Sequence, residues 1–471
     1  MTRRVLFCLV ICTLLAGVTA SAGPIYTVSA LGPDRLGYAI NNSGQVAGMD
    51  ISRNCAFVWL NGKIQYLPNL PSATISSASD INDKGEIVGW SGYGPGGSSG
   101  THAVLWRNGK AFDLGVPVGY KSSYATAINN LGQITCDAYT SGQNWITNPF
   151  VWSSGKWAIV STKFGFSYDI NDKGQVVGSI STGTIFHAFL WQNGRLSDIG
   201  GLAGRNAESE AYGINNYGQV VGFFALPNDS SYRHACIWQN GRVIDLSPNQ
   251  DDSYFTWAND INDRGQIVGS SHYHDPHGWP ELWQNGVMQQ ELPGGYGSGV
   301  AINNAGQLLF GQEYGSEIIL TPTPPQNVSL TPNSGSFKTG TKYTFTSRYL
   351  DAYVDNIANA YLLFNTGYIR TNAAYVKYDA VQNTLWVRNN GDNGWIGGFA
   401  PGSNKVIENS YCKLYCKETT LDASGNIGII NWRIEFKPTM AGKTCGAWMK
   451  AIDYQGRAFD FQKMGSNIAI K

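Results

Sequence analysis

The sequence predicts an all-β chain in which a seven-bladed β-propeller, closed by an N-terminal strand, precedes a C-terminal β-sandwich. Three observations support this prediction. A nine-residue pattern, clearest at Ile170 to Gly178, recurs seven times at intervals of 41 to 47 residues, and repeats of this length indicate a solenoid or a propeller. Asn-Gly pairs between short apolar runs recur with the same period. Charged residues make up only 14% of the chain, whereas Gly (57) and Tyr (25) are plentiful, which is typical of short strands and tight turns.

The first residues have the pattern of a secretory signal peptide. Arg3 and Arg4 precede an apolar run from Val5 to Val18, and Ala20-Ser21-Ala22 is a small-residue cleavage site. The apolar run is too short to cross a membrane comfortably. We therefore expect residues 1–22 to be removed near Ala22. The mature protein is expected to be secreted, to the extracellular space, the periplasm or the cell surface, without a membrane span.

Each repeat is expected to supply four antiparallel strands. In the fourth repeat, strands at 167–170 and 175–179 flank an Asn-Asp-Lys-Gly turn, and strands at 187–191 and 195–199 flank Asn193-Gly194. Asn and Asp tolerate left-handed backbone, and Asn-Gly is a strong hairpin signal. The third strand is almost continuously apolar, which indicates burial on both faces. Such sheets fit the blades of a propeller over residues 23–321.

The two ends of the repeat region are expected to meet. The seventh repeat has no fourth strand, because the segment Glu317 to Thr321 runs directly into prolines. The segment Ile25 to Gly32, which precedes the first repeat, ends like the fourth strands of the other repeats. We therefore expect residues 25–31 to pair with residues 317–321, because this closure removes the exposed edges of an open array.

The repeats resemble a bacterial family of extracellular proteins that is named after a His-Ala-Phe signature, the HAF-repeat family. The full signature is His187-Ala188-Phe189, and His102-Ala103 and His234-Ala235 are partial copies. The Ile-Asn-(Asn/Asp)-x-Gly-(Gln/Glu) turn is the more regular marker, and the resemblance covers roughly residues 25–321. It implies secretion and a repeat fold, and it implies no established chemistry.

A Pro-rich linker at residues 322–326 is expected to separate the repeats from a second domain at residues 327–471. In this domain the repeat period stops, and short apolar runs alternate with Gly and Asn clusters, which favours a β-sandwich. The stretch Asn383 to Ser403 and the segment Cys412-Lys413-Leu414 resemble Ig-like domains of bacterial surface proteins. Such domains usually act as spacers or adhesive modules.

Six cysteines follow the signal peptide. Cys55, Cys136 and Cys236 fall in different repeats and are expected to be small buried side chains. On one extended strand, four residues of separation place Cys412 and Cys416 about 13 Å apart, beyond the reach of a disulfide. The sequence therefore favours a bridge from Cys445 to one of them, with one cysteine left over.

The loops that leave one face of the predicted propeller are rich in aromatic residues, flanked by Gly, Asn and Ser. Exposed aromatic side chains in such loops suit stacking on sugars or docking of a protein segment, although many of them can also pack the loops down. The candidate ligand-binding residues are Trp90, Tyr93, Tyr139, Trp145, Tyr232, Trp257, Tyr273 and Trp279, with Tyr254 nearby.

No standard catalytic or metal-binding signature is present in the sequence. The Asn-Asp-x-Gly turns offer too few carboxylates for calcium, and we interpret them as hairpin turns. The loop His272 to His277 has three His and one Asp but no standard metal spacing, so a polar loop is the favoured interpretation. We expect His102, His187 and His234 to cap strand ends by hydrogen bonds. Acid pairs for catalysis would have to assemble across blades from Asp137, Glu208, Glu210, Asp251 or Asp252.

The function that these observations favour is a secreted or cell-surface protein that binds an extracellular glycan or protein and uses no cofactor. A secreted polysaccharide lyase or hydrolase that uses the same face is the alternative, and a purely structural surface protein is the third possibility. The formal net charge is zero, so no electrostatic footprint for nucleic acid is visible.

Overall fold

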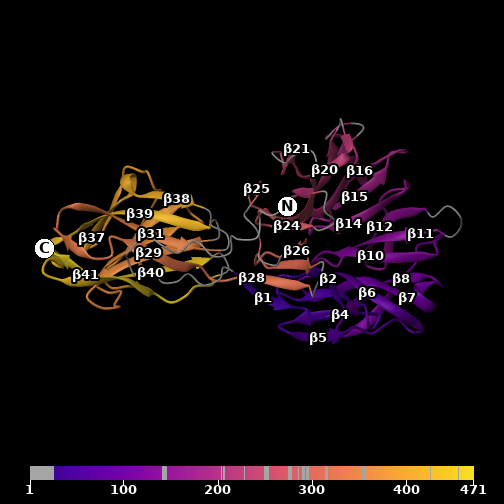
Figure 1. The fold of residues 1–471 in the computed structure, drawn as a ribbon, viewed down its shortest axis with the longest axis horizontal. Coiled ribbons are helices and arrows are strands. Elements are labelled where there is room, and N and C mark those ends of the chain that lie inside the picture. The colour runs from indigo at the N-terminus through magenta and orange to yellow at the C-terminus, as the bar shows by residue number, and fades with distance from the viewer. Residues whose placement is uncertain are drawn as a thin grey trace, which may run out of the picture. The chain divides into compact units, whose positions relative to one another are not determined.

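The computed structural model describes residues 26–471 apart from 141–145, 203, 205–206, 227–228, 249–253, 274–277, 285, 289–291, 293–295, 313–316, 352–356, 425 and 454–455. The chain divides into two compact units, Val28–Thr321 and Pro322–Lys471 with the residues up to Thr27. Both consist of β-strands and short 3-10 turns, so the all-β fold class is confirmed (Figure 1). Among the described residues, no helix has the length and apolar character that a membrane span requires.

The described residues of the first unit form seven four-stranded sheets, numbered here in chain order. Sheet 1 contains β2 (Arg35–Ile40), β3 (Val46–Asp50), β4 (Cys55–Leu60) and β5 (Lys63–Tyr66). Sheet 2 contains β6 (Ala73–Ile81), β7 (Ile87–Tyr93), β8 (Thr101–Arg107) and β9 (Lys110–Gly115). Sheet 3 contains β10 (Ser122–Ile128), β11 (Ile134–Tyr139), β12 (Thr147–Ser153) and β13 (Lys156–Ile159). Sheet 4 contains β14 (Gly165–Ile170), β15 (Val176–Ser181), β16 (Phe186–Gln192) and β17 (Arg195–Asp198).

The remaining three sheets follow the same plan. Sheet 5 contains β18 (Ser209–Ile214), β19 (Val220–Leu226), β20 (Asp229–Gln239) and β21 (Arg242–Asp245). Sheet 6 contains β22 (Tyr254–Ile261), β23 (Gln266–Tyr273), β24 (Trp279–Gln284) and β25 (Val287–Met288). Sheet 7 contains β26 (Gly297–Ile302), β27 (Leu308–Gln312) and β28 (Ile318–Pro322), and its fourth strand is β1 (Tyr26–Ala30).

The turns of the repeats have the conformations that their residues favour. In the second hairpin of sheet 4, Asn193 and Gly194 both have positive φ (51° and 81°), as a type I′ turn requires. The last glycine of the repeat, Gly178, is needed for a different reason. A Cβ atom at this position would lie 2.0 Å from the carbonyl oxygen of Phe166 on the neighbouring strand. The repeat is therefore specified both by turn chemistry and by close approach of two backbones.

The core of the first unit lies between neighbouring sheets. The first strand of each sheet packs against strands of the preceding sheet, as β14 does against β11 and β12. Each of the buried clusters draws its side chains from two consecutive sheets, and one of them joins sheet 7 to sheet 1 through Ile40, Phe57 and Leu309. Strand β2 of sheet 1 likewise contacts β26 and β27 of sheet 7. The first and last sheets are therefore neighbours in space.

The N-terminal strand lies where the sequence predicts it. Strand β1 is the neighbour of β28 in sheet 7, and in Figure 1 the indigo β1 lies beside the orange β28. The backbone N–H of Leu31 donates a hydrogen bond to the carbonyl oxygen of Glu317 at 2.8 Å. Tyr26 and Leu31 are almost fully buried. The expected pairing of residues 25–31 with residues 317–321 is confirmed for the described residues.

The second unit has two sheets. The six-stranded sheet contains β29 (Gln326–Thr331), β31 (Lys342–Leu350), β36 (Val406–Glu408), β37 (Cys412–Tyr415), β38 (Thr420–Ser424) and β39 (Ile427–Phe436). The seven-stranded sheet has the order β30 (Gly335–Phe337), β41 (Gln462–Ile470), β40 (Thr444–Asp453), β32 (Ile357–Asn365), β33 (Ala374–Asp379), β34 (Thr384–Arg388) and β35 (Trp395–Phe399). Four 3-10 turns are described in the chain, η1 (Pro95–Gly97), η2 (Gly200–Leu202), η4 (Cys416–Glu418) and η5 (Pro438–Met440).

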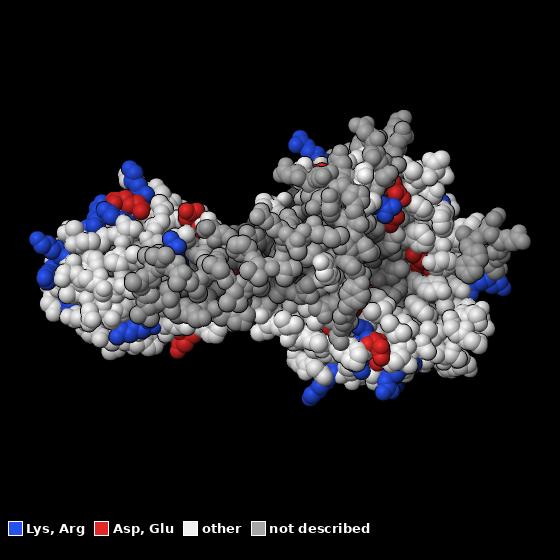
Figure 2. Space-filling model, in the orientation of Figure 1, with Lys and Arg blue, Asp and Glu red and all other residues white. Residues whose placement is uncertain are grey.

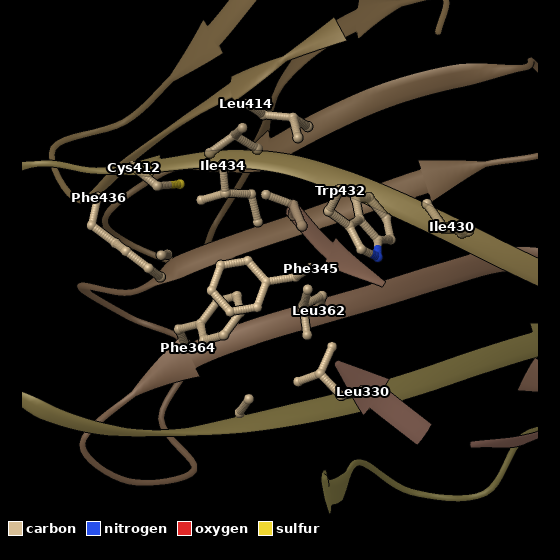
Figure 3. Close-up of a cluster of buried hydrophobic side chains, with 14 of the residues drawn as sticks. Leu330, Phe345, Leu362, Phe364, Cys412, Leu414, Ile430, Trp432, Ile434 and Phe436 are labelled. Carbon is tan, nitrogen blue, oxygen red and sulfur yellow. The ribbon is translucent and has the colours of Figure 1, made fainter. Parts of the chain in front are cut away.

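One apolar core joins these two sheets. Phe345 and Trp432 of the six-stranded sheet and Leu362 and Phe364 of the seven-stranded sheet belong to the same buried cluster, and Figure 3 shows their side chains converging between the strands. The charged side chains lie outside this core and are scattered over the molecular face drawn in Figure 2, among mostly uncharged surface.

The expected disulfide is wrong. Cys412, Cys416 and Cys445 are all free cysteines, as are the three cysteines of the repeats. Cys412 ends up at the start of β37, whereas Cys416 begins the 3-10 turn η4, so the two do not share one extended strand. All three thiols belong to the apolar core of the second unit, where burial raises the pKa of Cys412 to about 12 and that of Cys445 to about 11. They act there as small hydrophobic side chains.

Candidate functional site

The first asparagine of each repeat satisfies its own turn and also reaches the next sheet. In sheet 4, Oδ1 of Asn171 accepts hydrogen bonds from the backbone N–H groups of Lys173 and Gln175, both at 3.0 Å. Its Nδ2 donates to Oε1 of Gln175 at 2.8 Å and to the carbonyl oxygen of Asn215 in sheet 5 at 2.9 Å. All four hydrogen-bonding positions of this buried amide are therefore used.

The bond to the next sheet recurs at every sheet boundary. The Nδ2 donor and carbonyl acceptor pairs are Asn41 and Asn82, Asn82 and Asn129, Asn129 and Asn171, Asn171 and Asn215, Asn215 and Asn262, Asn262 and Asn303, and Asn303 and Asn41. The last bond, 2.8 Å long, runs from sheet 7 back to sheet 1. These seven bonds, called here the asparagine ring, form a closed circuit.

A second circuit uses the next residue of each repeat. Its backbone N–H donates to the side-chain oxygen of the equivalent residue in the following sheet, as Asn130 N–H does to Oδ1 of Asp172 at 2.8 Å. Asn and Asp alternate at this position, apart from the contact of Asn304 with Asn42. Because each Asp has an Asn beside it, the amide donates to the carboxylate, as from Asn42 to Asp83 at 2.9 Å.

The Ile-Asn-(Asn/Asp) segments of all seven repeats line a common cavity with a volume of about 180 Å³. Asp80 and Asp169, from the first strands of sheets 2 and 4, line this cavity, and Asp260 holds the equivalent position in sheet 6. Each bridges two neighbouring sheets. Asp169, for example, accepts from the backbone N–H groups of Ile170 at 2.6 Å and Ile214 at 2.7 Å. The sequence marks this position with an Asp directly before the Ile in three of the seven repeats, a signal that turn chemistry alone does not explain.

Burial of these carboxyl groups changes their titration. Burial raises the pKa of Asp169 to about 8, and the charges of Asp260 and Asp80 act in the same direction. Burial also raises the pKa of Asp80 to about 6. It raises the pKa of Asp260 too, and the backbone N–H groups that donate to this carboxylate limit the shift.

The stability of the first unit is expected to fall as the pH rises through these values. The folded chain binds the three protons more tightly than the unfolded chain does, so their contribution is complete below the unfolded pKa and is lost as pH rises from about 4 to about 8. The slope is at most ~1.4 kcal/mol per pH unit for each proton. Chemical denaturation at several pH values should show this decline and a smaller slope for Asp169→Asn. An unchanged slope in the variant would contradict the assignment.

The described members of the predicted aromatic set lie within strands and not in free loops. Trp90 lies in the middle of β7 and Tyr93 at its end, and both are partly buried. Tyr139 ends β11, on the side of the sheets away from the asparagine ring. Trp257 lies in β22, and Trp279, at the start of β24, is 42% exposed. Tyr232 lies in β20 and is partly buried.

Not every predicted residue can be placed. Trp145, Asp251, Asp252 and residues 274–277 lie outside the described residues, and for Tyr254 and Tyr273 only the backbone is described. Among the described residues, no group of three or more His, Cys, Asp or Glu side chains is arranged to hold a metal ion.

The aromatic side chains contact one another across the sheet boundaries. Ring centroids are 5.6 Å apart between Trp90 of sheet 2 and Tyr124 of sheet 3. Three further pairs cross boundaries farther along the chain: Tyr168 and Tyr212 at 5.2 Å, Tyr232 and Phe255 at 5.6 Å, and Trp279 and Tyr296 at 4.6 Å. This set of rings, called here the aromatic end, makes contacts across four of the seven sheet boundaries among the described residues.

A polar cluster that the sequence did not single out lies within the aromatic end. Tyr168 donates a hydrogen bond to Oε2 of Glu210 at 2.8 Å, and Tyr212 also bonds Glu210. Arg233 pairs with Glu208 at 3.0 Å and lies over the ring of Phe223 in the same sheet. Burial raises the pKa of Glu210, and the hydrogen bond from Tyr168 opposes this shift. The two glutamates were considered as acids, but their tyrosine and arginine partners were not.

The repeated histidines have a structural partner within each sheet. Nδ1 of His102, His187 and His234 lies 2.9 Å from a carboxylate oxygen of Asp113, Asp198 and Asp245 respectively. Each pair joins the start of the third strand to the fourth strand, so these histidines hold strand ends together, as the sequence predicted. They do not converge on one site.

Comparisons with known proteins add little to this description. No family model matches the chain, and no curated protein matches it. Among solved structures, the chain is similar to the extracellular domain of a candidate one-component system of B. thetaiotaomicron. The sequences are 8% identical, the TM-score is 0.29, and the match covers 93% of this chain and 69% of that one. A TM-score of this size is too low to transfer a fold or a function.

Proposed function

We propose that the first unit is a closed seven-bladed β-propeller whose aromatic end binds a glycan, or a segment of another protein, outside the cell. The two hydrogen-bonded circuits support the closed arrangement, because each returns from sheet 7 to sheet 1. The sequence resemblance to HAF repeats and the signal-like residues 1–22 support export. In this proposal the second unit is an Ig-like spacer or adhesive module.

The observation that carries the binding function is the contact between aromatic rings of neighbouring sheets at the aromatic end. Partly exposed rings meet across four of the sheet boundaries among the described residues. Carboxylate, hydroxyl and guanidinium groups lie among them at Glu210, Tyr168 and Arg233. Apolar ring faces combined with a few convergent polar groups are the composition of a small-molecule or glycan site, and this combination favours a glycan over a protein segment.

A glycan array with the purified full chain tests the proposal. Trp257 is partly exposed and packs edge-to-face on His272, so Trp257→Ala should weaken binding to the glycan that the array identifies by about tenfold or more. Tyr217→Ala is the matched control, because Tyr217 is 73% exposed on a hairpin of sheet 5 at the opposite end of the strands. Equal losses in both variants, or no glycan bound, would refute glycan binding at this end.

The polar cluster also supports a second candidate function, acid–base catalysis on a polysaccharide. A partly buried carboxyl group with a raised pKa, held by a tyrosine hydroxyl next to an arginine, is the kind of convergent titratable set that an enzyme needs. The same array followed by product analysis separates the two functions. Turnover that Glu210→Gln abolishes while binding is kept would establish catalysis, and binding without turnover supports a binding protein.

A further inference from the structure

The seven-stranded sheet of the second unit has an unusual outer face. Alternate residues of its strands point into the core, as Ala360, Leu362 and Phe364 do in β32. The residues between them point to the other side. There Leu363, Tyr375 and Trp448 form a second buried cluster, with partly buried neighbours. The outer face consists of Tyr361, Leu363, Tyr375, Lys377, Trp386, Arg388, Trp395, Trp448, Lys450, Phe461 and Lys463.

Basic and aromatic residues alternate across the strands of this face. Lys450 of β40 lies opposite Tyr361 of β32, Tyr361 lies opposite Lys377 of β33, and Lys377 lies opposite Trp386 of β34. At ~4.8 Å between neighbouring strands, this row extends for about 14 Å. In a second row, Lys463 of β41 lies opposite Trp448 of β40. The register of the sheet, and not the sequence order, brings these residues together.

The basic groups lie on the rings. Nζ of Lys377 is 5.3 Å from the ring centroids of both Trp386 and Trp395. The guanidinium carbon of Arg388 is 4.9 Å from the centroid of Trp395. Nζ of Lys450 is 5.7 Å from the centroid of Phe461. Each cation is thus held at a ring face by a cation–π interaction.

The charge of the face is positive on balance. The basic side chains of the face are Lys377, Arg388, Lys450 and Lys463, and Arg370 adjoins them through Asp392, which it shares with Arg388. The acidic side chains at the face are Asp379, Asp392 and Asp460, the last beside Tyr368. Five positive charges against three negative charges leave an excess of two. This excess stands out in a chain whose formal net charge is zero.

We propose that this outer face binds an anionic glycan. Sugar rings would stack on the partly exposed faces of Trp386, Trp395 and Tyr361. Carboxylate or sulfate groups of the glycan would pair with Lys450 and Lys463, because the face has fewer carboxylates than basic side chains. A glycan fits better than single-stranded nucleic acid, because the rings already contact one another, with centroids 5.1 Å apart for Tyr375 and Trp395. These rings therefore form a continuous surface, and they leave no gaps between them into which nucleic-acid bases could insert and stack.

Binding of the full chain to polygalacturonate, alginate and heparin, measured by isothermal titration calorimetry, tests this inference. We expect binding to at least one of them that weakens as salt rises from about 50 to about 500 mM, and no binding to neutral dextran. The double variant Lys450→Gln/Lys463→Gln should bind about tenfold more weakly. The charge-matched control Lys84→Gln/Lys417→Gln removes two exposed lysines elsewhere and should bind like the unmodified chain.

Trp257→Ala tells this face from the aromatic end of the first unit. If Trp257→Ala weakened binding of the anionic glycan and the double variant Lys450→Gln/Lys463→Gln did not, the glycan would be bound at the aromatic end and the inference would be overturned. A chain that binds none of the three anionic glycans overturns the inference. Equal binding to dextran, equal weakening by both double variants, or tighter binding to single-stranded DNA than to any of the glycans overturns it as well. Thermal unfolding of each variant confirms that a loss of binding is not a loss of folding.

Discussion

Removal of β1 is expected to destabilise the first unit more than any single substitution does. A chain that begins at Gly32 lacks the fourth strand of sheet 7 and the two buried side chains of Tyr26 and Leu31. Burial of two such side chains contributes on the order of 5 kcal/mol, which is comparable to the whole stability of many domains. The deletion also exposes the edge of β28 to pairing with other chains.

Thermal unfolding and size-exclusion chromatography measure this effect. The shortened chain should unfold well below the temperature of the chain that begins at Gly23, and it should tend to self-associate. Val28→Ala in the longer chain is the control, because Val28 is 58% exposed and its truncation leaves the strand paired. A shortened chain that is as stable and monomeric as the longer one would show that β1 does not close the structure.

The features that the sequence predicts well are those with local causes. The hairpin at Asn193-Gly194 follows from the backbone preferences of two residues, and the pairing of β1 follows from a missing strand at the other end of the repeats. The register of the strands follows from apolar periodicity. Each of these features can be predicted from a few neighbouring residues or from the number of strands that each repeat supplies.

The features that the sequence does not predict depend on partners in the next sheet. The Nδ2 group of Asn171 binds a carbonyl group 44 residues away, and Asp169 accepts from an N–H group 45 residues away. The sequence predicts Trp90 in a loop, whereas it lies within strand β7 and packs on Tyr124 of the next sheet. Lys377 and Trp386 meet only because two strands pair in one particular register. Such contacts become visible once the sheets are placed side by side.

The disulfide prediction failed for a related reason. It assumed that Cys412 and Cys416 belong to one extended strand, whereas the chain turns into η4 after Tyr415. The three cysteines belong to one apolar cluster and contribute to its packing without a covalent bond. The apolar character of the cysteines therefore predicts their burial correctly. The turn η4 after Tyr415 has no recognisable sequence motif, so the separation of Cys412 and Cys416 could not be predicted.

Asn171→Ala is expected to have the second largest effect, because it removes four hydrogen bonds at once. The backbone N–H groups of Lys173 and Gln175 lose their acceptor, and the carbonyl group of Asn215 in the next sheet loses its donor. Unsatisfied buried polar groups cost about 1–3 kcal/mol each, so a loss of roughly 3 kcal/mol or more is expected in the free energy of unfolding. Asn171→Asp keeps the two acceptor bonds, but it loses both donor bonds and places a buried carboxylate oxygen beside Oε1 of Gln175 and the carbonyl oxygen of Asn215, so it should destabilise the first unit as well.

Asp172→Asn is the matched control, one residue along the chain. An asparagine keeps an Oδ1 acceptor for the N–H of Asn130, and Asn216 already occupies the equivalent position in sheet 5. Its cost is therefore expected to be below about 1 kcal/mol. In denaturant titrations both Asn171 variants should be more destabilising than Asp172→Asn. If Asn171→Ala were no more destabilising than Asp172→Asn, the repeated geometry of the asparagine ring would be a consequence of the fold and not one of its causes.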